Sequence, residues 1–183
     1  MAEPRNRYSI VSLCLHWGIA LMVVIQVGLI TAHEAVDGDM SRTLIGWHKS
    51  VGMTILVLTL ARIVWRLMNP ALPLPDHTPR WQKILARTTH VLFYVLLLAL
   101  PLAGWASSSA AGRAVEWFGL FSWPNLPVPL DRSLARTFLN VHEAGVKVLY
   151  VVLALHVAGA LKHHFLDRDN ILHRMLPFLP RRP

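Results

Sequence analysis

The sequence predicts an all-α integral membrane protein, built as a bundle of four transmembrane helices. Of its 183 residues, 54% are hydrophobic and only 15% are charged, whereas soluble domains average about 45–50% and about 25%. The apolar residues gather in four long segments, separated by polar stretches that contain glycine or proline. About 20 apolar residues cross a bilayer as a helix, so residues 1–183 have room for four spans and short loops in a single domain.

The first predicted helix covers residues 9–32 and contains no Lys, Arg, Asp or Glu. Arg5 and Arg7 precede it, as basic residues precede the apolar core of a secretory signal peptide. The apolar run is longer than such a core, and no small-residue cleavage site ends it. We therefore expect a retained transmembrane helix.

The other three predicted helices cover residues 43–68, 84–107 and 137–165. Each is long enough to cross about 30 Å of hydrocarbon at about 1.5 Å per residue. Their charged residues lie within a few turns of an end: Lys49, Arg62, Arg66, Arg87, Glu143, Lys147 and Lys162.

The stretches between these helices are predicted loops. Residues 69–80 contain four prolines, which block helix continuation. Residues 108–131 contain further glycines and prolines, and the aromatic stretch 117–123 is suited to the membrane interface. Residues 166–183 form a predicted cytoplasmic tail.

The basic residues predict the orientation in the membrane. With both termini cytoplasmic, twelve of the 18 Lys and Arg residues lie inside and the remaining six outside, which the positive-inside rule favours. The six outer residues are Arg42, Lys49, Arg113, Arg132, Arg136 and Lys147. The net charge of +8 is thereby explained as a topology signal, and we expect no nucleic-acid partner. The single cysteine, Cys14, excludes an internal disulfide and a zinc–cysteine cluster.

Ten histidines are many for a membrane protein, because ionisable groups inside a bilayer are costly and are usually functional. Three of them, His33, His77 and His173, fall in predicted loops or the tail, where we expect solvated positions. His163 and His164 lie at the cytoplasmic end of the fourth helix. Five lie within the predicted spans: His16, His48, His90, His142 and His156.

The depths of these five histidines define two levels in the bundle. His142 and His156 are fourteen residues apart, a rise of about 21 Å and a rotation of four turns less about 40°. They therefore share one face of the fourth helix, near opposite membrane surfaces. His48 lies at the same outer depth as His142, and His16 lies at the same inner depth as His156. His90 is an additional histidine at the inner level.

Two facing imidazoles inside a helix bundle suit the axial ligation of haem. Glycines lie close to the four histidines in sequence and would clear space for a flat macrocycle, although small residues also let helices pack closely. These glycines are Gly18, Gly52, Gly145 and Gly159. A zinc or copper transporter is the alternative; it requires carboxylate or sulfur ligands beside the histidines, for which only Cys14 and Glu143 are available.

The ordered motifs resemble those of the bacterial cytochrome b561 family of four-helix, dihaem membrane proteins, over nearly the whole chain. They are Arg7-Tyr8-Ser9, Leu15-His16-Trp17, Trp47-His48-Lys49-Ser50-Val51-Gly52, Leu100-Pro101-Leu102-Ala103-Gly104, Val141-His142-Glu143, Leu155-His156-Val157-Ala158-Gly159 and Asp169-Asn170-Ile171-Leu172-His173-Arg174-Met175. The resemblance implies two haem b groups, with axial ligands matching His48 and His142 at the outer level and His16 and His156 at the inner level. It implies no ligand on the third helix, and so none at His90.

A chain of this size resembles the superoxide oxidase type of the family, an enzyme of the bacterial inner membrane. The resemblance implies oxidation of periplasmic superoxide and reduction of ubiquinone. An electron-transfer module serving a periplasmic redox protein is the alternative. The six outer basic residues are balanced by six acidic ones, so attraction of an anion depends on local arrangement. Lys49 and Lys147, close in sequence to the outer histidines, are candidates for an anion site, or else snorkel or pair with haem propionates.

A quinone site needs hydrogen-bond donors near the inner level. The candidates are Arg87, His90, His163 and His164. His90 could instead hold a haem propionate or a helix carbonyl. Arg62 and Arg66 are candidate partners of the inner propionates, or else snorkel to lipid head groups. The sequence does not determine the oligomeric state.

Overall fold

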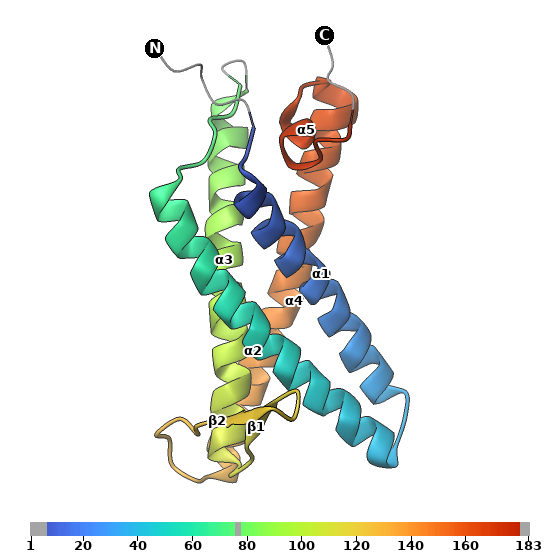
Figure 1. The fold of residues 1–183 in the computed structure, drawn as a ribbon, viewed down its shortest axis with the longest axis vertical. Helices are drawn as coiled ribbons and strands as arrows, with labels where there is room; N and C mark the ends of the chain where they lie inside the picture. The colour runs from blue at the N-terminus through green and yellow to red at the C-terminus, as the bar shows by residue number, and fades with distance from the viewer. Residues whose placement is uncertain (1–6, 76–77, 180–183) are drawn as a thin grey trace.

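The computed structural model describes residues 7–75 and 78–179. Four long helices form the bundle, and a small β-hairpin and a short helix complete the fold (Figure 1). In chain order the elements are α1 (Ile10–Glu34), α2 (Gly38–Met68), α3 (Arg80–Ala110), β1 (Val115–Trp117), β2 (Phe121–Trp123), α4 (Arg132–Lys162), a π-helical turn (His163–Asp167) and α5 (Ile171–Met175). His77 lies outside the described residues.

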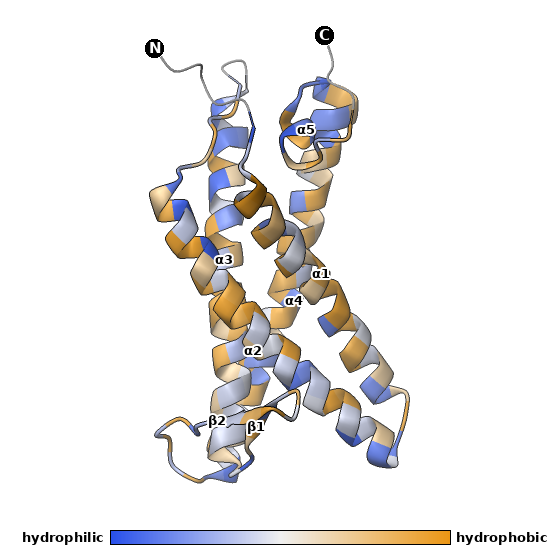
Figure 2. Cartoon of the chain, viewed as in Figure 1, coloured by the Kyte–Doolittle hydropathy of each residue, from blue (hydrophilic) through white to orange (hydrophobic). Residues whose placement is uncertain are grey.

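The four helices form two antiparallel pairs. α1 packs mainly on α2, α3 packs mainly on α4, and a contact between α2 and α3 joins the pairs. All four are long and apolar enough to cross a membrane, and hydrophobic residues dominate their middle parts, as Figure 2 shows. α1 begins and α5 lies at one end of the bundle, here called the α5 end, while the β-hairpin lies at the other, here called the hairpin end (Figure 1). The all-α membrane bundle predicted from the sequence is therefore confirmed.

Three of the helices begin earlier than the apolar segments do. α2 begins at Gly38 rather than residue 43, α3 at Arg80 rather than 84, and α4 at Arg132 rather than 137. At α4 the carboxylate of Asp131 accepts a hydrogen bond of 2.8 Å from the backbone N–H of Leu134, which caps the helix start. Hydropathy marks only the part of a helix that lies in lipid, so these polar first turns escaped the prediction.

The β-hairpin was not predicted, because residues 108–131 were expected to form only a loop. Its three-residue loop, 118–120, is closed by a hydrogen bond from Leu120 N–H to the Trp117 carbonyl. The two central residues of that turn, Phe118 at φ 49° and Gly119 at φ 73°, are both left-handed, as in a type I′ turn. The hydroxyl of Ser50 on α2 accepts a hydrogen bond from Phe118 N–H and donates one to the Glu116 carbonyl. The buried side chain of Val115 packs with Met53 and Leu56 of α2. The hairpin is therefore fastened to α2.

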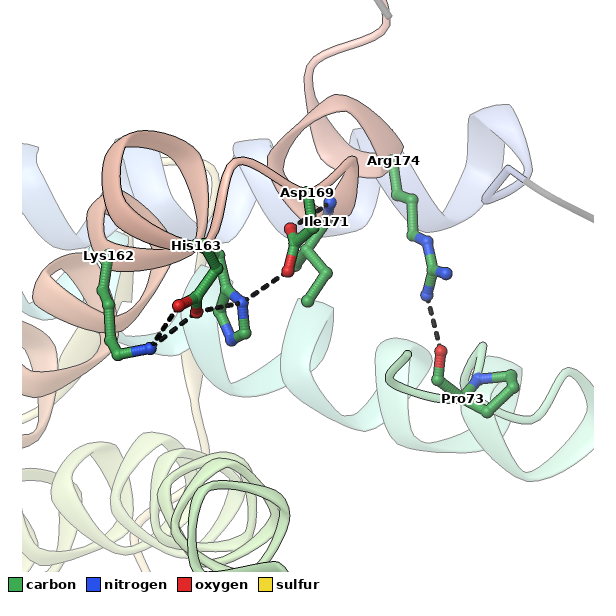
Figure 3. Close-up of polar contacts among 7 residues, drawn as sticks. Pro73, Lys162, His163, Asp169, Ile171 and Arg174 are labelled. Carbon is green, nitrogen blue, oxygen red and sulfur yellow. Dashed lines mark hydrogen bonds and ion pairs between the residues drawn. The ribbon is translucent and has the colours of Figure 1, made fainter. Parts of the chain in front are cut away.

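The segment after α4 folds back across the α5 end rather than trailing away as a tail. Arg168 has φ 54° and reverses the chain after the π-helical turn. Arg174 then donates to the carbonyl of Pro73 between α2 and α3 (Figure 3), and Trp17 Nε1 on α1 donates to the Met175 carbonyl at 2.8 Å. These bonds tie α5 to α1 and to the α2–α3 connection.

Two histidines expected at solvated positions are instead held in the structure. His173 of α5 is only 7% exposed, and its Nδ1 lies 2.6 Å from the Leu179 carbonyl. His33 lies in the last turn of α1, with its Nδ1 2.7 Å from the hydroxyl of Ser41 on α2. The expectation of a solvated surface position was wrong for His173, because the folded-back chain covers it.

Candidate haem-binding site

Two pairs of histidines face each other across the bundle at two levels. The ring centroids of His48 on α2 and His142 on α4 are 6.2 Å apart. The centroids of His16 on α1 and His156 on α4 are also 6.2 Å apart. These are the pairs expected from helix depth, and α4 contributes one histidine to each.

The separation within each pair fits a metal held between two imidazoles. An imidazole nitrogen binds a metal at about 2 Å, and with roughly 1 Å more from nitrogen to ring centroid, two rings on opposite sides of one ion have centroids about 6 Å apart. A direct hydrogen bond between imidazoles would bring their nitrogens to about 3 Å. Among the described residues no such bond joins the rings of either pair. The ring geometry therefore fits axial ligation.

The orientation of the His142 ring is set by a backbone group. Its Nδ1 donates to the Leu100 carbonyl of α3 at 2.9 Å, a partner that keeps the proton on Nδ1 and leaves Nε2 for a metal. The ring rests on Gly104, where a Cβ atom would lie 3.5 Å from His142 Nδ1. His48 differs, because its Nδ1 is buried and has no hydrogen-bond partner among the described residues.

The four glycines near the histidines fall into two kinds. A Cβ atom added at Gly18 or Gly159, next to the inner pair, would meet no atom within 4 Å. A Cβ atom at Gly145 would lie 2.6 Å from Leu100 Cδ2, and one at Gly52 would lie 3.1 Å from Gln26 Nε2. Open space beside Gly18 and Gly159 fits a large planar group at the inner level. Gly52 and Gly145 instead serve close helix packing.

The donor set argues for haem rather than for zinc or copper transport. Cys14 is exposed, as is Glu143. In residues 7–75 and 78–179, the one group of three close ligand-type side chains is His163, Asp167 and Asp169, at the α5 end. The outer pair therefore offers two imidazoles, and the inner pair offers two with a third, His90, beside His156. Two facing imidazoles are the axial donor set of a b-type haem.

Further candidate residues surround the inner pair. The His90 ring lies 5.5 Å from the His156 ring, and Phe93 packs on the same ring at 5.2 Å. Arg62 is close enough to interact electrostatically with His16, His90 and His156. Arg66 interacts with His90 and lies over the ring of Tyr8 at 5.3 Å. Arg62, Arg66 and His90 are thus brought together around the inner pair.

Three further candidates lie toward the inner end, and one of them, Arg87, precedes His90 by one turn of α3. His163 Nδ1 is 2.7 Å from Asp169 Oδ2 and 3.1 Å from Asp167 Oδ2, and Lys162 Nζ donates to Asp167 (Figure 3). His164 packs against Phe165. Arg87 is exposed on α3.

The hairpin end carries a group of cations that the sequence reasoning did not single out. Arg113, Arg132 and Arg136 line an open cavity of about 350 Å³ between the end of α3 and the start of α4. Arg113 also interacts electrostatically with Lys49. The four-residue spacing of Arg132 and Arg136, which places them on one helix face, was the available signal. Lys147 is exposed on α4.

Comparisons with known proteins agree with this geometry. The family model described as prokaryotic cytochrome b561 matches residues 7–178. The chain is 31% identical to "Cytochrome b561 homolog 2" of Escherichia coli K12, over 93% of this chain and 92% of the relative. It is 32% identical to "Probable superoxide oxidase CybB" of Yersinia pestis, over 94% of this chain and 97% of the relative. It is 25% identical to "Cytochrome b562" of Cereibacter sphaeroides, over 92% of this chain and 94% of the relative.

These matches extend over nearly the whole chain and include all four spans and both histidine pairs. The resemblance noted in the sequence motifs is therefore confirmed. The chain belongs to the prokaryotic cytochrome b561 family, and it is accordingly a multi-pass bacterial membrane protein that binds haem b and transfers electrons.

Proposed function

We propose that the protein binds two haem b groups and transfers electrons from superoxide, at the periplasmic face of the inner membrane, to ubiquinone within the membrane. The observation that carries this proposal is the pair of equal 6.2 Å separations, His48 to His142 and His16 to His156. Two metal sites at different depths in one bundle form a route for electrons across the bilayer. A single site would serve only one side.

The chain's own residues would hold the haems by their imidazoles. His48 and His142 are the proposed ligands of the outer group, and His16 and His156 those of the inner group. When bound, each haem supplies an iron that gains and loses one electron. Arg62 and Arg66, near the inner pair, are the proposed partners of the inner propionates, because a guanidinium group would pair with a carboxylate there.

The proposed orientation places both termini in the cytoplasm. The described chain begins and ends at the α5 end (Figure 1), and the excess of basic residues belongs to the same side. The hairpin end, with His48 and His142, then faces the periplasm. The α5 end, with His16 and His156, then faces the cytoplasm.

At the periplasmic end, basic side chains around the arginine-lined cavity form the proposed binding site for superoxide. Two superoxide ions each give up one electron and leave as O₂, and one quinone takes up both electrons with two protons. The outer surface has no net charge, so a local cluster must attract the anion. Arg113, Arg132 and Arg136 around one cavity, with Lys49 beside Arg113, form such a cluster. Lys147 remains a further candidate on α4.

At the cytoplasmic end His90 is the proposed hydrogen-bond donor to quinone, because it lies against His156 and has no part in either facing pair. Arg87, His163 and His164 are the other candidate quinone residues. The linked groups Lys162, Asp167, His163 and Asp169 could hold the protons that quinone reduction consumes. An open apolar recess of about 440 Å³ beside Trp17 and α5 would admit an apolar quinone tail from the lipid.

An alternative is electron transfer to or from a periplasmic redox protein. The observation that favours it is the apolar tip of the β-hairpin, where Phe118, Leu120 and Phe121 are 47%, 74% and 49% exposed. Exposed apolar patches often mark protein contacts. The same tip would equally suit the membrane interface.

The proposed function is tested by rapid mixing of the purified, oxidised protein with superoxide. We expect superoxide to reduce the haem and added ubiquinone to re-oxidise it. Reduction by a periplasmic redox protein but not by superoxide would favour the alternative. A visible spectrum without haem bands would reject both.

A further inference from the structure

Gln26 is a polar residue in an unexpected place. It lies within α1, one of the four membrane-spanning helices, where a polar group without a partner is costly. Its side-chain oxygen, Oε1, is buried and has no hydrogen-bond partner among the described residues. Nothing in the proposed electron route uses this amide.

The Gln26 side chain lies against the part of α2 that carries His48. Its Nε2 atom would be only 3.1 Å from a Cβ atom at position 52, so the amide packs on the bare backbone of Gly52. Gly52 follows His48 by four residues and lies on the same helix face. The main chain of Gln26 also lies within hydrogen-bonding reach of the His48 ring, although it forms no regular hydrogen bond with His48 Nδ1. The amide and the imidazole are thus neighbours at the α1–α2 contact.

The Nδ1 atom of His48 requires a hydrogen-bond acceptor. This buried Nδ1 forms no regular hydrogen bond with a described residue, and only the main chain of Gln26 lies within reach of the ring. Nδ1 of His142, in contrast, is bonded to the Leu100 carbonyl. An imidazole that binds metal through Nε2 carries its proton on Nδ1, and such N–H groups almost always donate to a nearby acceptor. Two residues that contact each other therefore each carry a buried polar atom without a regular hydrogen bond, Oε1 of Gln26 and Nδ1 of His48.

We propose that Gln26 is a positioning residue for the outer haem, and that its Oε1 accepts the Nδ1–H hydrogen bond of His48 when haem is bound. The inference rests on the proposed role of His48 as a ligand. The proposed contact requires the amide to turn about its last side-chain bonds, from Gly52 toward His48 one helical turn earlier on α2. The absence of a side chain at Gly52 leaves room for that turn.

This hydrogen bond has two physical consequences. It fixes the plane of the His48 ring, as the Leu100 carbonyl does for His142. It also makes the imidazole a stronger electron donor, because the proton on Nδ1 is partly shared, and a stronger donor favours the ferric state. Gln26 should therefore lower the reduction potential of the outer haem and slow its loss.

The test replaces the amide without changing the length of the side chain. Gln26→Met removes the acceptor, whereas Gln26→Glu keeps an oxygen at the same position. Gln82→Met is the matched control, because it removes the chain's other glutamine, which lies in the first turn of α3 far from the outer pair in sequence. Redox titration followed by visible and electron paramagnetic resonance spectra reports each haem, and the two are told apart with the His142→Ala and His156→Ala proteins.

We expect Gln26→Met to raise the ferrous-to-ferric ratio of the outer haem about tenfold at a fixed potential, which is about 59 mV for a one-electron couple. Transfer of the outer haem to apomyoglobin should be about 10- to 100-fold faster, the usual effect of losing such a partner. Gln26→Glu should leave the potential equal or lower. The inner haem in all variants, and both haems in Gln82→Met, should be unchanged.

An outer potential that is unchanged in Gln26→Met, or raised equally by Met and Glu, would overturn the inference. Where Gln26→Met fails to assemble, Gln26→Glu decides: a raised potential rejects the hydrogen bond, and an equal or lower one supports it. The His48→Ala variant distinguishes failure of the ligand assignment from failure of the Gln26 inference. If that protein keeps its outer haem, the ligand assignment is wrong; if it loses the haem and Gln26 has no effect, only this inference fails.

Discussion

The rings of His48 and His142 lie 6.2 Å apart, on helices from different antiparallel pairs of the bundle. A haem between them would therefore join the α1–α2 pair to the α3–α4 pair at the hairpin end. Binding to the folded state alone stabilises that state. We expect the packing of the two pairs to depend on haem as well as on the contact between α2 and α3.

The first prediction concerns the ligand pairs. His142→Ala should remove the outer haem and largely spare the inner one, and His156→Ala should do the reverse, because each histidine belongs to a different pair. The pyridine haemochrome assay counts haems per protein. His33→Ala is the control, since His33 bonds to Ser41 outside both pairs. Two haems bound in either alanine variant of a pair would contradict the assignment.

The second prediction concerns orientation. A fluorescent protein fused after the last residue should be active and alkaline phosphatase fused there should be inactive, because the basic residues place the C-terminus in the cytoplasm. A second fusion in the α1–α2 connection, at Asp37, should show the opposite behaviour. Alkaline phosphatase and a fluorescent protein provide the two readouts. A periplasmic C-terminus would reverse the proposed side of every site.

The third prediction concerns His90. His90→Leu should keep both haem spectra and their reduction by superoxide, but re-oxidation by added quinone should slow about five- to a hundredfold. His90 is exposed on α3, so the hydrogen bond would form where lipid rather than water surrounds it. The loss of such a bond costs about 1–3 kcal/mol. Stopped-flow absorbance measures the re-oxidation, and Thr88→Leu, an exposed neighbour on α3, is the control. Loss of one haem would instead show that His90 is a ligand.

The fourth prediction concerns the arginine cavity. Combined replacement Arg113→Gln, Arg132→Gln and Arg136→Gln should slow haem reduction by superoxide about tenfold at low salt, because local cations raise the encounter rate of an anion. The difference should shrink at high salt, where charges are screened within a few ångströms. Arg42→Gln is the control, since Arg42 is exposed and already paired with Asp39. An equal loss at all salt concentrations would indicate damage to the site rather than loss of attraction.

Several features of the molecule could be predicted from the sequence because they depend on a single helix. The rotation and rise per residue of a helix are constant, so the shared face of His142 and His156 followed from their spacing. The four spans followed from the length of the apolar segments. The depth of each histidine followed from its distance to a helix end, and the structure brings together the pairs that those depths suggest.

Features that depend on contacts between helices required the tertiary structure. The sequence shows His90 at the inner depth, but only packing places it against His156. Arg113 lies nineteen residues before Arg132 in the sequence, and the two meet because the chain returns from α3 to α4 around the β-hairpin.

The burial of individual side chains also depended on the tertiary structure. The tail residue His173 is buried because the chain reverses at Arg168 and folds back, which brings the Leu179 carbonyl to His173 Nδ1. Gln26 was an unremarked polar residue in an apolar segment until α2 placed Gly52 and His48 beside it. The period of one helix can be read along the chain, whereas the partners of a side chain depend on where the other helices lie.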